Sequence, residues 1–226
     1  MISVGILDTR GLGQSPSLAS HLPKSENLRI EKIKNEKKKR LSFFSRVLLS
    51  EMYEREFKKK LPEISYTEEG KPYFKSKECF FSISQSEDFV AVVISDFEVG
   101  VDIQSDYGNE DTLKKLEKRF ELEVFDNAEE DKENEIQFSF FYIIEEKENV
   151  VLKENKTKCF GFKFRKNEGE CFLFRWTRLE SALKLIGGGF KDLINVNKNL
   201  QNIRFKTLFF QHGGAPVALS IAFFEN

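Results

Sequence analysis

The segment Val99-Gly100-Val101-Asp102-Ile103-Gln104 alternates apolar with small or polar side chains along its whole length. This period of two predicts a β-strand whose successive side chains point to opposite faces. Val99, Val101 and Ile103 should face the core, and Gly100, Asp102 and Gln104 should face the other side. Asp102 is then a carboxylate on an exposed face or in a cleft, beside a glycine that leaves room for a ligand. The alternative is an ordinary aspartate near a strand end.

Upstream of this strand the pattern predicts one long helix and several strands. From Glu31 to Tyr53 apolar residues recur at spacings of three and four, which indicates a helix. Leu61–Phe74 is rich in turn residues. Short strands are expected at Ile2–Leu7, Phe80–Ile83 and Val90–Ile94.

Downstream, the chain alternates between charged turns and phenylalanine-rich segments. Helices are expected at Thr112–Phe120 and Thr177–Ile186, the second ending at three glycines, Gly187–Gly189, that suit a left-handed cap. The remaining segments are an exposed acidic loop at Asp126–Glu135 and strands at Ile136–Ile144, Cys159–Arg165, Glu170–Arg175, Phe205–Phe210 and Val217–Phe224. This order favours an α+β fold over a doubly wound sheet.

Composition excludes several classes of protein. With 226 residues, 40% of them hydrophobic, the chain can bury a sizeable core without disulfides. Three cysteines lack the spacing of a zinc site. The start of the chain lacks the pattern of a signal peptide, and no apolar run is long enough to span a membrane. We therefore expect a cytoplasmic protein.

Charge is unevenly distributed although the formal net charge is only −1. Leu28–Lys60 carries 12 basic and 5 acidic residues, a net of 12 − 5 = +7, and Glu121–Glu154 carries 3 basic and 12 acidic residues, a net of 3 − 12 = −9. The basic segment could meet phosphates or an acidic protein, or it could be a solvated helix face. Nucleic-acid binding is not favoured, because aromatic residues do not form a stacking platform among these bases.

Three further motifs accompany the strand at Val99–Gln104. They are Gly70-Lys71-Pro72-Tyr73-Phe74, Ser84-Gln85-Ser86, and the segment from Trp176 to Lys184. Glu180 and Lys184 share a helix face because they are four residues apart. Glu180 could ligate a metal or accept a proton, and Lys184 could hold a phosphate. Alternatively, Glu180 completes a capping box with Thr177, or pairs with Lys184 at the surface.

Together and in this order, the motifs resemble the 4′-phosphopantetheinyl transferases of the larger, surfactin-synthetase-activating type. The resemblance implies a Mg²⁺-dependent enzyme that transfers 4′-phosphopantetheine from coenzyme A to a serine of an acyl or peptidyl carrier protein and releases 3′,5′-ADP. It implies an α+β pseudo-dimer of two similar halves, each a small antiparallel sheet packed on a long helix. We place these halves at about 1–97 and 98–226 and expect a monomer.

The resemblance also implies roles for individual residues. Glu180 and Lys184 would be catalytic. The metal would be held by Asp102, Glu180 and, through a water, Gln104, with Asp106 as a further candidate. Contacts to coenzyme A would come from Lys71, Pro72, Ser84, Gln85 and Arg40. The basic helix near Lys37–Arg46 would be a docking surface for an acidic carrier protein.

The chain departs from the family pattern at several positions. Gln85 stands where the family usually has histidine, Gln104 where a second acidic ligand is common, and Leu179 where a lysine is usual. The distance from Asp102 to Glu180, 180 − 102 = 78 residues, indicates an inserted acidic loop and hairpin at about 126–164. These departures leave a second hypothesis open, a catalytically impaired homologue that binds coenzyme A or a carrier protein without transfer.

Overall fold

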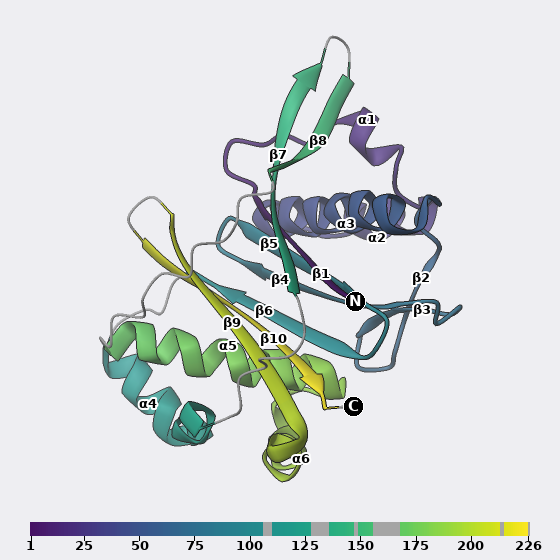
Figure 1. The fold of residues 1–226 in the computed structure, drawn as a ribbon. Helices are drawn as coiled ribbons and strands as arrows, with labels where there is room; N and C mark the ends of the chain where they lie inside the picture. Colours follow the sequence, from purple (N-terminus) through teal and green to yellow (C-terminus); the bar gives the residue numbers. More distant parts are fainter. Residues whose placement is uncertain (106–109, 128–135, 147–148, 156–167, 213–214, 226) are drawn as a thin grey trace.

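The computed structural model describes residues 1–105, 110–127, 136–146, 149–155, 168–212 and 215–225, which form a mixed α+β fold as the sequence predicted (Figure 1). The helices are α1 Pro16–Ala19, α2 Lys24–Glu31, α3 Glu36–Phe57, α4 Glu110–Phe120, α5 Glu168–Ile186 and α6 Leu193–Asn199, with short 3-10 turns η1 Leu122–Asn127, η2 Phe190–Asp192 and η3 Leu200–Asn202. The strands are β1 Ile2–Asp8, β2 Ile64–Tyr66, β3 Pro72–Phe74, β4 Phe80–Ser86, β5 Phe89–Ser95, β6 Val99–Gln104, β7 Ile136–Glu146, β8 Asn149–Asn155, β9 Ile203–His212 and β10 Ala215–Phe224.

Two sheets lie face to face between the two long helices. One sheet has the strand order β4-β5-β1-β7-β8, and the other has the order β6-β10-β9. Strands β2 and β3 form a separate small hairpin. In Figure 1, α3 lies on one side of the pair of sheets and α5 on the other. The order of layers is therefore helix, sheet, sheet, helix.

Alternation along the strands produces three hydrophobic layers. Val4 and Val93 of the first sheet pack against Val101 and Ile221 of the second. Leu7, one of the residues on the opposite face of the first sheet, packs with α3. A third layer lies between the second sheet and α5, and α4 and α6 also contribute to it. The prediction that the odd-numbered apolar residues of β6 face the core is confirmed.

The same connectivity occurs twice along the chain. A first strand leads to a long helix and then to an antiparallel hairpin, as β1, α3, β4 and β5 and again as β6, α5, β9 and β10. In each set the last strand lies between the other two and is antiparallel to both. Strand β7 adds to the first set by pairing in parallel with β1, and β8 pairs with β7.

A glycine in the first strand of each set brings the long helix close to the sheet. A Cβ atom at Gly5 would lie 2.5 Å from the sulfur of Met52 in α3. A Cβ atom at Gly100 would lie 2.0 Å from the backbone oxygen of Ser181 in α5. The expectation that Gly100 leaves room for a ligand is therefore wrong, because the backbone of α5 fills that space.

The expectation of a strand at Glu170–Arg175 is also wrong, since these residues form the first part of α5. Their aromatic content favours a strand in isolation. In the fold, however, Phe172 stacks on Trp176 four residues later, with ring centroids 5.5 Å apart. This helical spacing lets Phe172 and Leu173 enter the third hydrophobic layer, and tertiary packing outweighs local propensity.

The long helix of the first half begins later than predicted. A separate helix, α2, precedes it and ends at Glu31. The side chain of Asn35 accepts a hydrogen bond from the backbone N–H of Lys38 and so starts α3 with an N-cap. Among the other expected segments, Cys159–Arg165 lies outside the described residues, and the strand that forms a hairpin with β7 is β8.

Among the described helices, none combines the length and the apolar character that a membrane crossing requires.

Replacing Gly100 by alanine should destabilise the fold, because the new methyl group meets backbone atoms that cannot move independently of α5. We expect a loss of about 1–3 kcal/mol or more in the free energy of unfolding, the range for overpacking. Gly13→Ala is the matched control, since no atom lies within 4 Å of the position that its new Cβ atom would take. Urea denaturation measures both, and equal midpoints for the two variants would contradict the close contact.

Candidate functional site

Strands β4 and β6 meet through side-chain hydroxyls. The backbone N–H groups of Val101, Ile103 and Ser105 donate, in that order, to the Oγ atoms of Ser82, Ser84 and Ser86, each over 3.2 Å. The other edge of β6 pairs with β10, so these alternate N–H groups face outward and need acceptors. The period-two serines of β4 supply them. This hydroxyl ladder joins the two sets of strands.

Ser84 also belongs to a buried polar cluster. Its hydroxyl donates to Oδ1 of Asp102 over 2.7 Å. The ammonium of Lys184 donates to the same Asp102 oxygen over 2.6 Å and to Ser84 Oγ over 2.8 Å. Asp102 comes from β6, Ser84 from β4 and Lys184 from α5. Tertiary structure therefore assembles this Asp102–Ser84–Lys184 cluster from both halves of the chain.

The second oxygen of Asp102 is buried and has no hydrogen-bond partner among the residues that the structure describes. The Asp102 side chain is only 8% exposed, whereas Lys184 is 30% exposed. A buried carboxylate oxygen without a donor is costly unless a cation or a ligand group satisfies it. Oδ2 of Asp102 is thus the atom of this cluster with an unmet requirement for positive charge.

Glu180 lies one turn before Lys184 on α5. Burial, followed by the neighbouring Asp102 carboxylate, raises the pKa of Glu180 to about 7, while Lys184 acts in the opposite direction. Near neutral pH this carboxyl group is close to half ionised. It can therefore accept a proton, and a nearby cation would shift it toward the ionised form.

Gln104 lies two residues beyond Asp102 on the same strand face. Its amide oxygen accepts a hydrogen bond from the Ser86 hydroxyl over 3.1 Å. Asp106, the further candidate ligand, lies outside the described residues. The strand thus presents one carboxylate and one amide in a row.

The carboxylate oxygens of Asp102 and Glu180 are suitable ligands for a magnesium ion. The ion takes carboxylate oxygens and retains several waters, so it does not need a complete set of protein ligands. Asp102 offers an unpartnered oxygen, and Glu180 lies near enough for the Asp102 charge to raise its pKa. Within the described residues no group of three or more Asp, Glu, His or Cys side chains could hold a metal. Water and substrate oxygens would have to complete the coordination.

Lys71 contacts α5 from the turn between β2 and β3. Its ammonium donates to the backbone carbonyl of Leu185 over 2.9 Å, at the C-terminal end of the helix, where positive charge is favourable. Burial lowers the pKa of Lys71, and the charge of Glu98 partly opposes this. Gly70 supplies the left-handed residue of the turn, with φ +87°. The turn therefore spans the two halves beside the cluster.

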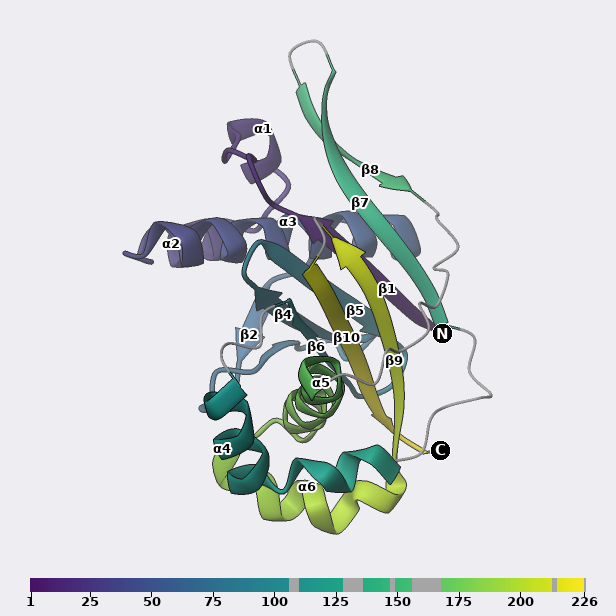
Figure 2. The same cartoon turned by 90° about the vertical axis from the view of Figure 1, so that its left-hand side faces the viewer.

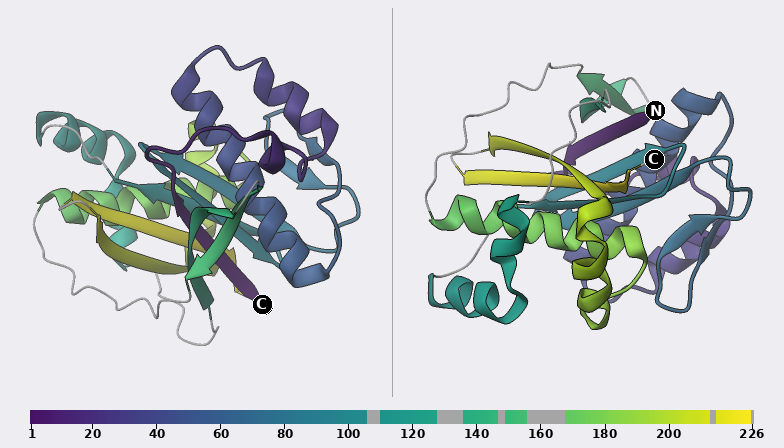
Figure 3. Two further views of the ribbon diagram at one scale, coloured as in Figure 1. Left: turned by 90° about the horizontal axis from the view of Figure 1, so that it is seen from above. Right: turned by 60° about the horizontal axis from the view of Figure 1, so that its bottom comes forward.

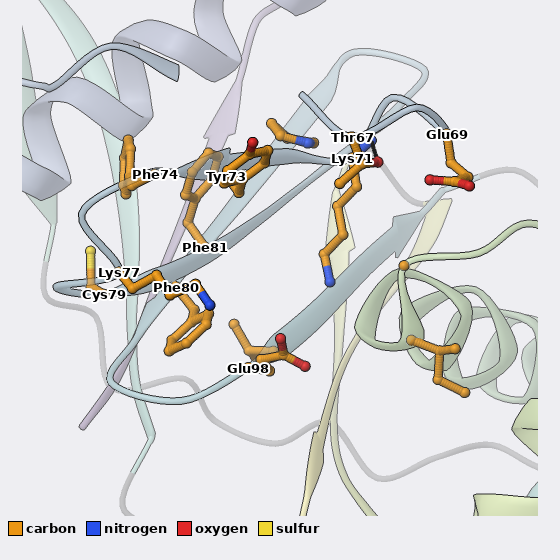
Figure 4. A pocket seen from close by; sticks show the side chains of 14 residues that line it. Thr67, Glu69, Lys71, Tyr73, Phe74, Lys77, Cys79, Phe80, Phe81 and Glu98 are labelled. Atoms are coloured by element: carbon orange, nitrogen blue, oxygen red, sulfur yellow. Dashed lines mark hydrogen bonds between the residues drawn. The ribbon is translucent and has the colours of Figure 1, made fainter. Parts of the chain in front are cut away.

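Lys71 lines two cavities. One, of about 240 Å³, is lined by residues that include Pro72, Ser82 and Lys184. Another, of about 390 Å³, is lined by residues that include Tyr73, Phe80 and Glu98. Figure 4 shows the Lys71 side chain extending into this second cavity toward Glu98. The expected Lys71–Pro72 turn thus lines the smaller cavity, which Lys184 also lines.

Two expected site residues lie apart from the cluster. Gln85 follows Ser84 and points to the opposite face of β4, where its amide donates to the Ser45 hydroxyl of α3 over 3.0 Å. Arg40 forms an ion pair with Asp88, in the turn between β4 and β5. Strand alternation directs Gln85 away from Asp102. Arg40 binds Asp88 instead.

Both structural alternatives for Glu180 are wrong. Thr177 cannot cap the helix, since α5 begins at Glu168 and the Thr177 hydroxyl donates to the carbonyl of Leu173 within it. Among the ion pairs of the described residues, Lys184 pairs with Asp102 and not with Glu180, although its charge still lowers the pKa of Glu180. Trp176 lies inside α5 and stacks on Phe172 one turn earlier.

Sequence reasoning missed Ser82 and the structural part played by Ser86. The signal was present as serines at alternate positions of β4, Ser82, Ser84 and Ser86, with Ile83 and Gln85 between them. That pattern predicts a polar strand face, but it does not identify the partner strand.

Comparison with known proteins adds no family assignment: no family model matches the chain, and no curated protein matches it. The candidate site rests on the geometry of its own residues.

The pKa of Glu180 predicts how stability depends on pH. Folding raises this pKa from 4.5 to about 7, so the contribution of the carboxyl group to stability is complete below 4.5 and is lost as pH rises through 7. Glu180→Gln removes the charge and should raise the melting temperature relative to the parent protein at pH 8 by more than at pH 5. Calorimetry at both pH values without added metal tests this. The exposed Glu68→Gln variant is the control, and a difference independent of pH at position 180 would contradict the assignment.

Proposed function

We propose that the chain is a Mg²⁺-dependent 4′-phosphopantetheinyl transferase, a holo-[carrier protein] synthase. The observation that carries the proposal is the Asp102–Ser84–Lys184 cluster, beside Glu180, at the contact between two strand sets of equal connectivity. The motif resemblance assigns these same residues to the metal and the phosphates. They lie far apart in sequence and meet in one buried cluster.

In the proposed reaction a serine hydroxyl of the carrier protein attacks the β-phosphorus of coenzyme A. A new P–O bond forms to the serine, and the bond between this phosphorus and the bridging pyrophosphate oxygen breaks. The products are the phosphopantetheinyl carrier protein and 3′,5′-ADP, which keeps the bond's electron pair. The serine loses one proton, and negative charge develops on the phosphate oxygens.

Residues of the chain can fill each role in this step. Glu180, with a pKa of about 7, can take the serine proton directly or through a water. Lys184 has three N–H donors, and Asp102 and Ser84 use two of them, so one can reach a phosphate oxygen. The cavity lined by Lys71, Pro72 and Lys184 offers space for the nucleotide end of coenzyme A.

Asp102 and Glu180 would hold the magnesium ion, with Gln104 contacting it through a water. Bound there, the ion would supply positive charge to the pyrophosphate oxygens and so favour departure of the leaving group. Lys184 already binds Oδ1 of Asp102, which leaves the buried Oδ2 as the oxygen without a hydrogen-bond partner in the described chain.

We also propose that the fold is a pseudo-dimer whose halves, about 1–97 and 98–226, are built on β1, β4 and β5 and on β6, β9 and β10. Strands β7 and β8 come from the second half of the chain but extend the first sheet, where β7 pairs in parallel with β1. The repeated order of strand, long helix and hairpin supports the pseudo-dimer. The equivalent glycines Gly5 and Gly100, each in contact with the long helix of its own set, support it further. A single chain then supplies both walls of the site. A monomer in the cytoplasm stays our expectation.

A non-catalytic protein that binds coenzyme A or a carrier protein is the second candidate. It is favoured by Gln104, a neutral amide that Ser86 already engages. A transfer assay separates the two candidates. The protein is incubated with fluorescent coenzyme A, apo-carrier protein and increasing Mg²⁺, and labelled carrier is measured. Binding of coenzyme A without any transfer would establish the second candidate instead.

Removal of either carboxylate should abolish transfer. Asp102→Asn and Glu180→Gln keep the shape of each side chain but remove its charge, so the affinity for Mg²⁺ should fall and turnover should drop to background. Circular dichroism checks that the variants fold, and the exposed Glu68→Gln variant should retain full activity. Normal turnover of a folded Asp102→Asn protein would show that this carboxylate does not hold the metal.

Lys184→Ala should lower turnover by roughly 10²-fold or more, the range for loss of one preorganised donor to a transition state. The variant also leaves Asp102 without its cation, so its melting temperature should be followed in parallel. Lys60→Ala, an exposed lysine on another surface, is the control. A loss of stability with unchanged turnover would assign Lys184 to structure alone.

A further inference from the structure

One face of α5 connects the candidate site to an exposed aromatic surface. Phe172, Trp176, Glu180 and Lys184 recur at intervals of four and so lie along one stripe of the helix. Lys184 binds Asp102 at one end of this stripe. Trp176 lies one turn beyond Glu180 in the other direction, about 6 Å along the helix axis. Whatever binds over Trp176 is therefore next to Glu180.

Helices α4 and α6 extend this surface away from α5. In Figures 2 and 3 each of these helices lies beside α5, and each packs against it. Phe120, the last residue of α4, and Phe190 of η2 pack on each other with ring centroids 4.7 Å apart. Each also contacts Trp176, in both cases with centroids 5.8 Å apart. These three side chains form one continuous aromatic group. We call this group, together with Arg119, Lys191 and Ile194, the Phe190 surface.

Part of the Phe190 surface is open to solvent. Phe190 is 44% exposed and Ile194, on the following helix, is 67% exposed. Large apolar side chains that cluster at the surface commonly mark an interaction site. Here Phe190 contacts Trp176, which lies one helical turn from a carboxyl group that is proposed to be catalytic.

Several basic side chains lie around these apolar residues, together with the acids Glu121 and Asp192. Arg119 lies over the Phe120 ring at 5.3 Å, and Lys191 follows Phe190 in the chain. Lys115 and Lys118 are exposed on the same short helix as Arg119. In the part of the chain that the structure describes, none of these four cations takes part in an ion pair. The nearby acid Asp192 accepts a hydrogen bond from the backbone of Gly189.

The basic segment on α3 is a weaker candidate for binding an acidic protein. Lys37 pairs with Glu87, and Arg40 pairs with Asp88. These internal acids neutralise part of the positive charge that the sequence places there. None of the exposed large apolar residues belongs to α3 within the described chain. The Phe190 surface combines both properties that an acidic, partly apolar partner would recognise.

We propose that the Phe190 surface docks the carrier protein, an acidic partner whose acceptor serine is then directed toward Glu180. This inference rests on the proposed transferase function and names the surface that selects its protein substrate. Apolar contact with Phe190 and Ile194 provides the affinity, and the surrounding cations orient the partner and raise the association rate.

The test is steady-state kinetics of transfer to an acidic apo-acyl carrier protein, with coenzyme A and carrier varied separately. Ile194→Asp should raise the KM for the carrier roughly tenfold or more, equivalent to about 1.4 kcal/mol, and leave the KM for coenzyme A unchanged. The double variant Arg119→Glu/Lys191→Glu should do the same at low salt, with an effect that shrinks as salt screens the charges. Both variants lie outside the catalytic cluster, so kcat at saturating carrier should hold.

Two controls make the result specific. Leu28→Asp changes another exposed apolar residue, 49% exposed on α2, and should leave every constant unchanged. Lys34→Glu/Lys38→Glu reverses exposed charges near the start of α3. If this pair raises the KM for the carrier and Ile194→Asp does not, docking occurs on α3 and the inference is wrong. If the wild-type protein transfers nothing, the transferase function fails and the docking inference fails with it. If the wild-type protein transfers normally and Ile194→Asp has no effect, only the docking inference is overturned.

Discussion

Backbone N–H groups of β6 donate to serine hydroxyls of β4, and this ladder holds the two sheets against each other at the site. Ser84 takes part in two sets of contacts at once. It accepts from the backbone of Ile103 and donates to the carboxylate of Asp102. The polar cluster consequently forms only when the two halves are joined in this register. A structural contact and a chemical one depend on the same hydroxyl group.

The two strand sets use the same local geometry for different purposes. In Val4-Gly5-Ile6-Leu7 and in Val99-Gly100-Val101-Asp102, a glycine touches the long helix and the second residue after it lies beneath that helix. Leu7 is fully buried there and adds to the hydrophobic core. Asp102 is almost as buried, and its charge requires Lys184 and Ser84 as partners. One half of the chain packs at this position, and the other presents a carboxylate.

The charges of the cluster are unequal, which directs its chemistry. Two carboxyl groups, Asp102 and Glu180, lie near one ammonium group, that of Lys184. Burial, and after it the Asp102 charge, keeps a proton on Glu180 to higher pH than usual. Within the described residues, one oxygen of Asp102 has no hydrogen-bond partner. A small divalent cation would correct both conditions. The arrangement therefore suits phosphate chemistry that combines a metal, a proton acceptor and a fixed cation.

Local pattern was sufficient for most of the elements and for one face of the site. Period-two alternation located β6 and its inward residues, and the spacing of Glu180 and Lys184 placed both on one helix face. Pattern failed where distant contacts outweigh propensity. The segment at Glu170–Arg175 becomes helical because its aromatic residues pack at helical spacing. Only the tertiary structure could decide that α5 fills the space over Gly100, that Gln85 turns away from Asp102, and that Lys184 binds Asp102. Each of these outcomes depends on which element lies opposite, and no local period carries that information.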